Sequence, residues 1–153
     1  MTGKLRQNVL GVILDYQDNV LLVARAHDPF HWQFPQGGVN DGEDPDYAIF
    51  RELKEEVGTH SFSIIQVCPE KHVYHWSRNL IRDEHIGQEQ TIYLLRFHGS
   101  TDEIRVDGRE LGGSLWLPPY KVDVFLHDYR KPVWEMIKKH YQIPTLQEKN
   151  NHS

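Results

Sequence analysis

The sequence predicts an α/β fold in which a mixed β-sheet is covered by helices on its faces. Short β-branched and aliphatic runs lie on both sides of one strongly marked helix, and a second helix follows the last run. The chain has 153 residues, is 39% hydrophobic and 25% charged, and is therefore long enough to bury one core. We expect a single domain over residues 1–144 and a loose polar tail over residues 145–153.

The predicted strands begin with a hairpin. Residues 8–14 and 20–25 are apolar runs separated by the polar turn Asp15–Asn19. Further runs predict strands at residues 62–68, 72–76, 91–98 and 114–117. The stretch 77–90 is polar, charged and aperiodic, so we expect a long loop or hairpin arm near whatever the sheet binds.

The best-marked helix is expected over residues 45–57. Asp44 is a good N-cap, Pro45 suits the first helical position, and Gly58 can close the C-terminus. The stripe expected to face the core consists of Ile49, Phe50, Leu53 and Val57. Two more helices are expected near the C-terminus, at residues 122–126 and 131–141.

The formal net charge of -5 is concentrated in residues 40–56, which hold seven acidic and two basic residues. The acids and bases of the remaining chain cancel. A cluster of carboxylates on this scale either stays in water or collects cations. An acidic chain also lacks the wide basic surface needed to bind duplex DNA, so any contact with nucleic acid should be local, at an end.

The composition also argues against a membrane or secreted protein. No run of about 18 apolar residues is present, and the N-terminus lacks the apolar stretch of a signal peptide. The single cysteine, Cys68, excludes an internal disulfide and a structural zinc site, and is expected to be a buried strand residue. We expect a cytoplasmic protein, as a monomer or small homo-oligomer, with no membrane contact.

Three glutamates of the predicted helix share one face, because Glu52 lies three and four residues before Glu55 and Glu56. Their mutual repulsion costs a few tenths of a kcal/mol per pair. Clustered carboxylate oxygens suit Mg²⁺ or Mn²⁺. Taken alone, the three residues fit a solvated helix face better than a metal site. The glycine-rich loop before the helix, which contains Gly37-Gly38, favours a ligand site because it can bring backbone close to a ligand.

The full spacing is Gly37, five residues, Glu43, seven residues, then Arg51-Glu52-Leu53-Lys54-Glu55-Glu56-Val57-Gly58. This segment resembles the Nudix box, G-x5-E-x7-R-E-U-x-E-E-x-G-U with U aliphatic. It matches every defined position but the last, where Thr59 replaces an aliphatic residue and should weaken a core contact. The resemblance implies the Nudix α/β/α sandwich fold with its catalytic loop and helix.

The resemblance also implies a reaction, the hydrolysis of a phosphoanhydride bond with two or three divalent ions. It implies that Glu52, Glu55 and Glu56 are metal ligands with catalytic roles. The carbonyl of Gly37 is a further candidate ligand. An ion pair between Arg51 and Glu43 is expected to lock the loop on the helix.

The surrounding sequence resembles one branch of the family, the bacterial RNA pyrophosphohydrolases and dinucleoside polyphosphate hydrolases. The match begins with His31-Trp32-Gln33-Phe34-Pro35-Gln36-Gly37-Gly38. Other matching features are Arg6 before Asn8-Val9, Gly87-Gln88-Glu89-Gln90, Glu110 upstream of Trp116, and Tyr129-Arg130. His31 and His127 stand where this branch often carries other residues, which leaves the base preference open.

This second resemblance implies the remaining site residues. Glu110 matches a glutamate outside the box and is the candidate fourth ligand or general base, a role that Glu55 or Glu56 could also take. Arg6, Tyr129 and Arg130 match positions that hold the nucleotide end of the substrate, and rings and guanidinium groups both stack on bases. Trp76 is a weaker candidate, because aromatic residues in strands more often serve packing.

The expected function is removal of pyrophosphate from the 5' end of triphosphorylated RNA, which starts mRNA decay. The close alternative is asymmetric hydrolysis of diadenosine tetra- or pentaphosphate, and a cap or nucleoside-diphosphate-linked substrate is more distant. A non-catalytic nucleotide-sensing module is a third class. The intact box disfavours it, since a pure binding module does not need every carboxylate.

Overall fold

The computed structural model describes residues 3–77 and 84–141. The strands of this part are β1 (Lys4–Leu14), β2 (Val20–Arg25), β3 (Asp28–Gln33), β4 (Gln36–Gly38), β5 (Phe62–Val67), β6 (His72–His75), β7 (His85–Phe97) and β8 (Leu111–Leu117). The α-helices are α1 (Pro45–Val57), α2 (Pro119–Phe125) and α3 (Lys131–Tyr141), with 3-10 turns η2 (Thr101–Glu103) and η3 (Asp128–Arg130). None of the helices described is long and apolar enough to cross a membrane.

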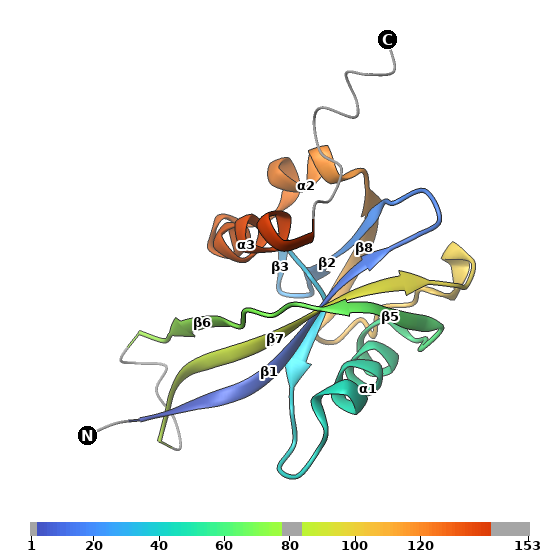
Figure 1. The fold of residues 1–153 in the computed structure, drawn as a ribbon. Helices are drawn as coiled ribbons and strands as arrows, with labels where there is room; N and C mark the ends of the chain where they lie inside the picture. The colour runs from blue at the N-terminus through green and yellow to red at the C-terminus, as the bar shows by residue number, and fades with distance from the viewer. Residues whose placement is uncertain (1–2, 78–83, 142–153) are drawn as a thin grey trace.

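The strands form one mixed sheet around a long parallel pair. The strand order is β3-β2-β1-β7-β5, with β4 paired to β1, β6 to β7 and β8 to β2. β1 and β7 run parallel from the pair Lys4 and His85 to the pair Leu14 and Arg96, whereas the other pairings are antiparallel. In Figure 1, β1, β7 and β6 extend together toward the N-terminal side of the molecule.

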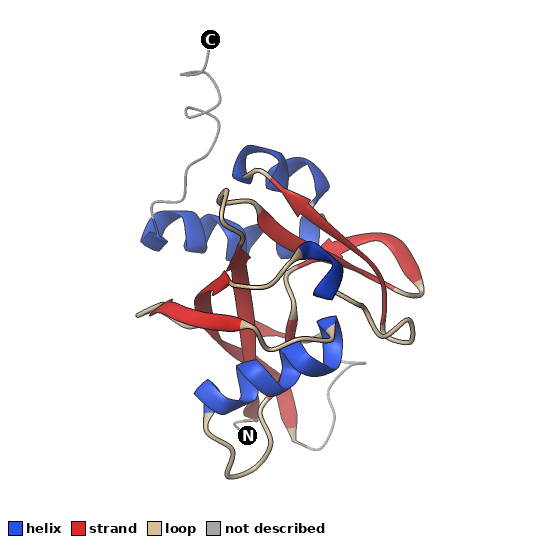
Figure 2. Ribbon diagram, turned by 90° about the vertical axis from the view of Figure 1, so that its right-hand side faces the viewer, coloured by secondary structure: helices blue, strands red, loops and turns tan. Residues whose placement is uncertain are grey.

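Two hydrophobic cores lie on the two faces of this sheet. Along β1, Val9 and Ile13 pack with the buried face of α1, whereas Leu10, Val12 and Leu14 pack with α2 and α3. This alternation follows from the two-residue period of a strand. Figure 2 shows α1 on one side of the strands and the C-terminal helices on the other. The predicted sandwich is therefore confirmed.

The helix that carries the box begins and ends where the sequence predicts. The Asp44 side chain accepts a hydrogen bond from the Asp46 N–H at 2.8 Å, and Pro45 occupies the first turn. Gly58 ends the helix in the left-handed conformation, with φ 81° and its N–H bonded to the Lys54 carbonyl. A Cβ at Gly58 would also lie 3.0 Å from the Arg105 carbonyl, so the position favours glycine twice over.

Thr59, which replaces the aliphatic residue at the last position of the box, forms hydrogen bonds. Thr59 is buried, and its hydroxyl accepts the Ser61 N–H at 3.1 Å and donates to Glu103 at 3.4 Å. The hydroxyl thus closes the turn after α1, where an aliphatic side chain could only have packed.

Several features of the fold differ from the sequence prediction, and β1 and β8 also begin earlier than predicted, at Lys4 and Leu111. β3 and β4 were not predicted, because their sequence contains prolines and glycines and lacks an apolar alternation. β7 begins at His85, inside the predicted loop, because pairing with β1 satisfies its backbone although its side chains are polar. α2 begins at Pro119, three residues before the expected start. Residues 78–83 of that loop and the expected C-terminal tail lie outside the described residues.

Candidate active site

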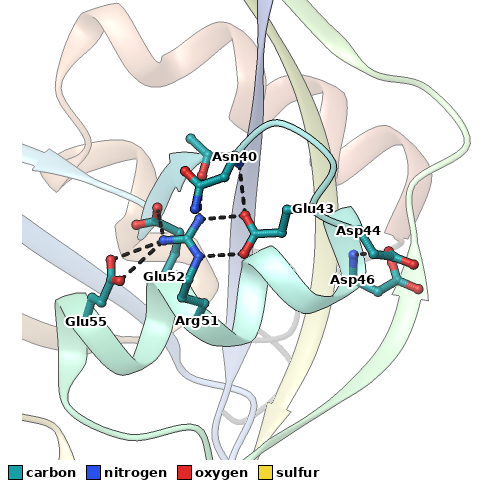
Figure 3. A network of polar contacts seen from close by, with 8 residues as sticks. Asn40, Glu43, Asp44, Asp46, Arg51, Glu52 and Glu55 are labelled. Atoms are coloured by element: carbon teal, nitrogen blue, oxygen red, sulfur yellow. Dashed lines mark hydrogen bonds and ion pairs between the residues drawn. The ribbon is translucent and has the colours of Figure 1, made fainter.

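Arg51 fastens the glycine-rich loop to α1 (Figure 3). Its Nε lies 2.6 Å from Glu43 Oε2 and its Nη2 lies 2.8 Å from Glu43 Oε1, a bidentate pair. Nη2 also donates to the Gly38 carbonyl at 2.8 Å, and the Asn40 N–H donates to Glu43 at 3.0 Å. The guanidinium and this N–H lower the pKa of Glu43 to about 2. The predicted ion pair between Arg51 and Glu43 is present.

The three box glutamates lie in different surroundings. Arg51 Nη1 donates to Glu52 Oε1 at 2.9 Å and lies 3.3 Å from Glu55 Oε2. The Glu55 side chain is 58% exposed, at the outer edge of the helix. Glu56 is buried, and its Oε1 accepts the Gln36 N–H at 2.9 Å. Within the described ranges, no three His, Cys, Asp or Glu side chains are gathered closely enough to hold a metal ion as they stand.

Gly37 lets the backbone of β4 pass directly beside Glu52. A Cβ at Gly37 would lie 2.0 Å from the Glu52 carboxyl carbon and from its Oε2, so any side chain there would displace the carboxylate. Gly37 pairs with Val9 of β1, which fixes the strand in this position. The candidate backbone ligand and a candidate carboxylate ligand are thus neighbours.

A cavity of about 650 Å³ opens beside these residues. Its lining includes Gly37, Glu56 and Glu110, together with Arg25, Arg109 and Arg130. The loop that carries Glu110 is held by Asp107, whose Oδ1 accepts the N–H groups of Arg109, Glu110 and Leu111 at 3.0 Å each. The structure therefore brings Glu110 into the same cavity as a box glutamate, although 54 positions separate it from Glu56.

Carboxyl groups cluster on the α1 side of this cavity. Burial raises the pKa of Glu56 to about 8, and the charges of Glu52, Glu110 and Asp107 add to the effect. Burial also raises the pKa of Glu52, against the opposing influence of Arg51. A nearby cation would favour the ionised forms of these carboxylates. The candidate metal ligands are all oxygen atoms, from carboxylates and the Gly37 carbonyl, so these residues fit a divalent ion such as Mg²⁺.

A second cavity of about 400 Å³ adjoins the first and shares Gln36, Tyr74 and Arg130 with it. Its lining is mainly apolar and aromatic, and includes Leu10, Phe34, Val73, Tyr129 and Val133. The Tyr74 and Tyr129 rings meet edge to face with centroids 5.8 Å apart. The Arg130 guanidinium lies 5.1 Å from the Tyr129 ring centre. Tyr129 and Arg130, predicted to hold the nucleotide, therefore come together in one cavity.

Arg6 and Trp76 lie apart from these two cavities. A Cβ at Gly38 would lie 2.7 Å from Arg6 Nη2, and Arg6 lines a third cavity together with Asn40 and Glu43. Trp76 follows the end of β6, and its N–H donates to the Ile86 carbonyl at 2.8 Å. It lines neither of the two adjoining cavities. The substrate roles expected of Arg6 and Trp76 remain predictions.

The sequence interpretation missed several lining residues, above all Tyr74 and the glutamines Gln33 and Gln36. A chain of side-chain amides joins some of them: Gln90 Nε2 donates to Asn8 Oδ1 at 2.9 Å and to Gln36 Oε1 at 2.6 Å. The available signal was a set of amide residues inside otherwise apolar strands, since buried amides are seldom placed there without partners.

Comparison with known proteins agrees with this geometry. The NUDIX domain family matches residues 4–139. An RNA pyrophosphohydrolase of Ectopseudomonas mendocina (strain ymp) is 38% identical over 145 residues, 86% of this chain and 91% of that protein. Nudix hydrolase 25 of Arabidopsis thaliana is 36% identical over 148 residues, 88% of this chain and 84% of that protein. A crystal structure of a C. elegans Ap4A hydrolase binary complex superposes with a TM-score of 0.66 at 18% identity, covering 88% of this chain and 96% of that one. The chain belongs to the NUDIX family of hydrolases.

Proposed function

We propose that this protein removes pyrophosphate from the 5' end of triphosphorylated RNA and leaves a 5'-monophosphate end, which starts mRNA decay. The observation that carries the proposal is the junction of two cavities of different chemistry. The first holds carboxylates and arginines, and the second is apolar and aromatic. A polyphosphate chain in the first with a nucleobase in the second matches the chemistry of an RNA 5' end. The bacterial relatives named RNA pyrophosphohydrolase support this substrate.

The cofactor we propose is a set of two or three divalent ions, Mg²⁺ or Mn²⁺. Glu52, Glu56 and Glu110 would hold them, with Glu55 and the Gly37 carbonyl as further ligands. Bound ions would activate water and neutralise charge on the phosphoryl oxygens. Glu55 lies at the exposed edge of the helix, against Arg51, so its participation requires its carboxylate to turn away from that guanidinium.

Side chains of the protein position the loop, bind the polyphosphate and accept a proton from water. Arg51 holds the loop against the helix and so fixes Gly37 beside Glu52. Arg25 and Arg109 place positive charge along the larger cavity, where the polyphosphate would lie. Glu110 stands on an exposed loop of the same cavity, where water can reach it, and is our candidate for general base. Glu55 and Glu56 are the alternatives, since neighbouring carboxylates share their titration.

Asymmetric hydrolysis of diadenosine tetra- or pentaphosphate is the second candidate function. The likeness to the Ap4A hydrolase favours it only as a fold, because the two chains are 18% identical. The two-cavity geometry suits it as well, since a dinucleoside polyphosphate also presents a phosphate chain with a nucleoside at its end.

Turnover on two substrates decides between these functions. Purified protein with Mg²⁺ is given a short 5'-triphosphate RNA or diadenosine tetraphosphate at low micromolar concentration, and released pyrophosphate and ATP are followed. A much higher kcat/KM on RNA supports the proposal. Faster ATP release would replace it with dinucleoside polyphosphate hydrolysis, and saturable binding without turnover of either compound would indicate a sensing module.

A further inference from the structure

Arg130 is a partly buried cation at the junction of the two cavities. It lines both of them, and burial lowers its pKa because the charged form loses water. Among residues 3–77 and 84–141, no carboxylate lies within ion-pair distance of its guanidinium. Asp128, two positions away, pairs instead with Lys131 at 2.9 Å. Arg130 therefore keeps a charge that the described part of the chain does not neutralise.

Neutral side chains hold this guanidinium, namely His31 and Gln33 of β3 together with Tyr74. Arg130 Nε donates to His31 Nε2 at 3.1 Å, and Arg130 Nη2 donates to Gln33 Oε1 at 2.9 Å. Both partners are buried and lie two positions apart on β3, so they point to the same side of the strand. An uncharged acceptor pair fixes the direction of the guanidinium without cancelling its charge.

The His31 acceptor is itself held in place. Its ring stacks on the His127 ring, with centroids 4.0 Å apart and planes within 9° of parallel. The Nδ1 atom of the His127 ring accepts the backbone N–H of Tyr129 at 3.1 Å. The backbone N–H of His127 donates to the Trp32 carbonyl at 3.0 Å. Burial and the charge of Arg130 lower the pKa of His31 to about 4, so its Nε2 lone pair stays available at neutral pH.

From this geometry we propose that His31 and Gln33 are positioning residues that present Arg130, as an unneutralised cation, to the phosphate joining the polyphosphate chain to the nucleoside. The proposal rests on the proposed function, since it takes the larger cavity as the polyphosphate site and the smaller one as the base pocket. Among the described residues, those that line both cavities and would meet the phosphate at their junction are Gln36, Tyr74 and Arg130. A guanidinium matches the geometry of phosphate oxygens, which makes Arg130 the anion-binding member of the three.

Two substitutions of one residue separate this role from simple packing. His31→Gln keeps a neutral acceptor near the place of Nε2, whereas His31→Phe keeps the ring and its stacking on His127 but removes the acceptor. We expect His31→Phe to raise KM for triphosphate RNA about tenfold with little change in kcat, and His31→Gln to stay within about threefold of the native KM. A better KM in the Phe variant, equal KM increases in both, or no change in either would overturn the proposal.

Gln33 provides a second test, which separates charge from position. Gln33→Glu should hold Arg130 at least as firmly, because it adds a charge-assisted hydrogen bond, but it neutralises the cation. We expect this variant to raise KM about tenfold or more. The slope of the logarithm of the RNA-binding constant against the logarithm of the salt concentration should become shallower by up to about one, the loss of one phosphate contact. A native KM in Gln33→Glu would overturn the proposal. Because this variant does not alter His31, the test also stands if a histidine variant fails to fold.

Binding without turnover keeps this test separate from that of the proposed function. Fluorescence anisotropy of a labelled 5'-monophosphate trinucleotide RNA, with the label at its 3' end, is measured for each variant. The control is His98→Gln, since His98 lies at the end of β7 and bonds to Ser63 away from both cavities. If the native protein fails to turn over triphosphate RNA, the proposed function fails. If the native protein turns over RNA and the variants bind it equally well, only the positioning role fails.

Discussion

Arg51 and Arg130 are both partly buried arginines, yet their partners differ in kind. Arg51 bonds to Glu43, Glu52 and the Gly38 carbonyl, and lies 3.3 Å from Glu55. These carboxylates raise its pKa. Arg130 is held by uncharged partners, a histidine, a glutamine and a tyrosine, and its pKa is lowered by burial. One guanidinium is saturated by the protein, and the other retains a charge for a ligand.

The difference in partners assigns Arg51 to the stability of the fold and Arg130 to the binding of a ligand. A cation surrounded by carboxylates neutralises them and ties a loop to a helix, so its loss leaves buried negative charge. A desolvated cation without a carboxylate partner costs the fold free energy, and a bound anion would recover it. The same residue type can therefore serve architecture at one end of the cavity and ligand binding at the other. Variants on either side of the cavity test this division.

The largest effect is expected on the carboxylate side, from Glu56→Gln. The amide oxygen can still accept the Gln36 N–H, so we expect the fold to persist, but the charge that a divalent ion requires is lost. We predict a fall in kcat of about a thousandfold or more with Mg²⁺, measured by pyrophosphate release, with an unchanged circular dichroism spectrum. Glu135→Gln, an exposed glutamate on α3, is the matched control. An unaltered rate in Glu56→Gln would refute the site assignment.

The two arginines themselves give the next effect. Arg51→Met leaves Glu43 and Glu52 without their cation and releases the loop from α1, so we expect the free energy of unfolding to fall by more than in Arg130→Met. Arg130→Met removes a desolvated charge, so we expect a change of no more than about 1 kcal/mol, together with weaker RNA binding. Urea unfolding followed by tryptophan fluorescence measures both variants. A larger loss of stability in Arg130→Met than in Arg51→Met would reverse the division drawn here.

Substrates with and without a base should sharpen the division between the cavities. Tyr129 is 54% exposed and borders the smaller cavity, where its ring can stack on a nucleobase. We predict that Tyr129→Ala weakens binding of the RNA end by about 1–3 kcal/mol and leaves hydrolysis of a simple pyrophosphate compound unchanged. Tyr16→Ala, at the tip of the first hairpin, is the control. Equal losses on both substrates would argue against a base platform.

The carboxylate side of the site could be predicted from the sequence because it is local. Glu52, Glu55 and Glu56 share a helix whose first and last residues are set by Asp44 and Gly58, so spacing alone places the carboxylates on one face. The mixed sheet and the packing of helices on both its faces followed in the same way, from apolar runs and their order.

The surroundings of Arg130 could not be predicted in this way, because they are assembled from distant segments of the chain. Arg130 meets His31 and Gln33 across 99 and 97 positions, on a strand that carries no apolar alternation. His31 is buried on a strand whose first three residues are exposed. Its burial depends on the stacking partner His127 and on a backbone bond to Trp32, and neither leaves a periodic signal.

The smallest effect concerns the pH dependence of stability. The pKa of His31 is about 4 in the fold against 6.5 in the unfolded chain, so between these values the unfolded state binds more protons. Stability from this group is therefore complete above pH 6.5 and is lost as the pH falls, by about 1 kcal/mol between pH 6.5 and 5.5. His31→Phe lacks this titration, and the other histidines cancel when it is compared with the native protein. If the free energy of unfolding depends on pH in the same way in the two proteins, the pKa of His31 is not lowered in the fold, and below about pH 6.5 the imidazole would face Arg130 as a second cation instead of an acceptor.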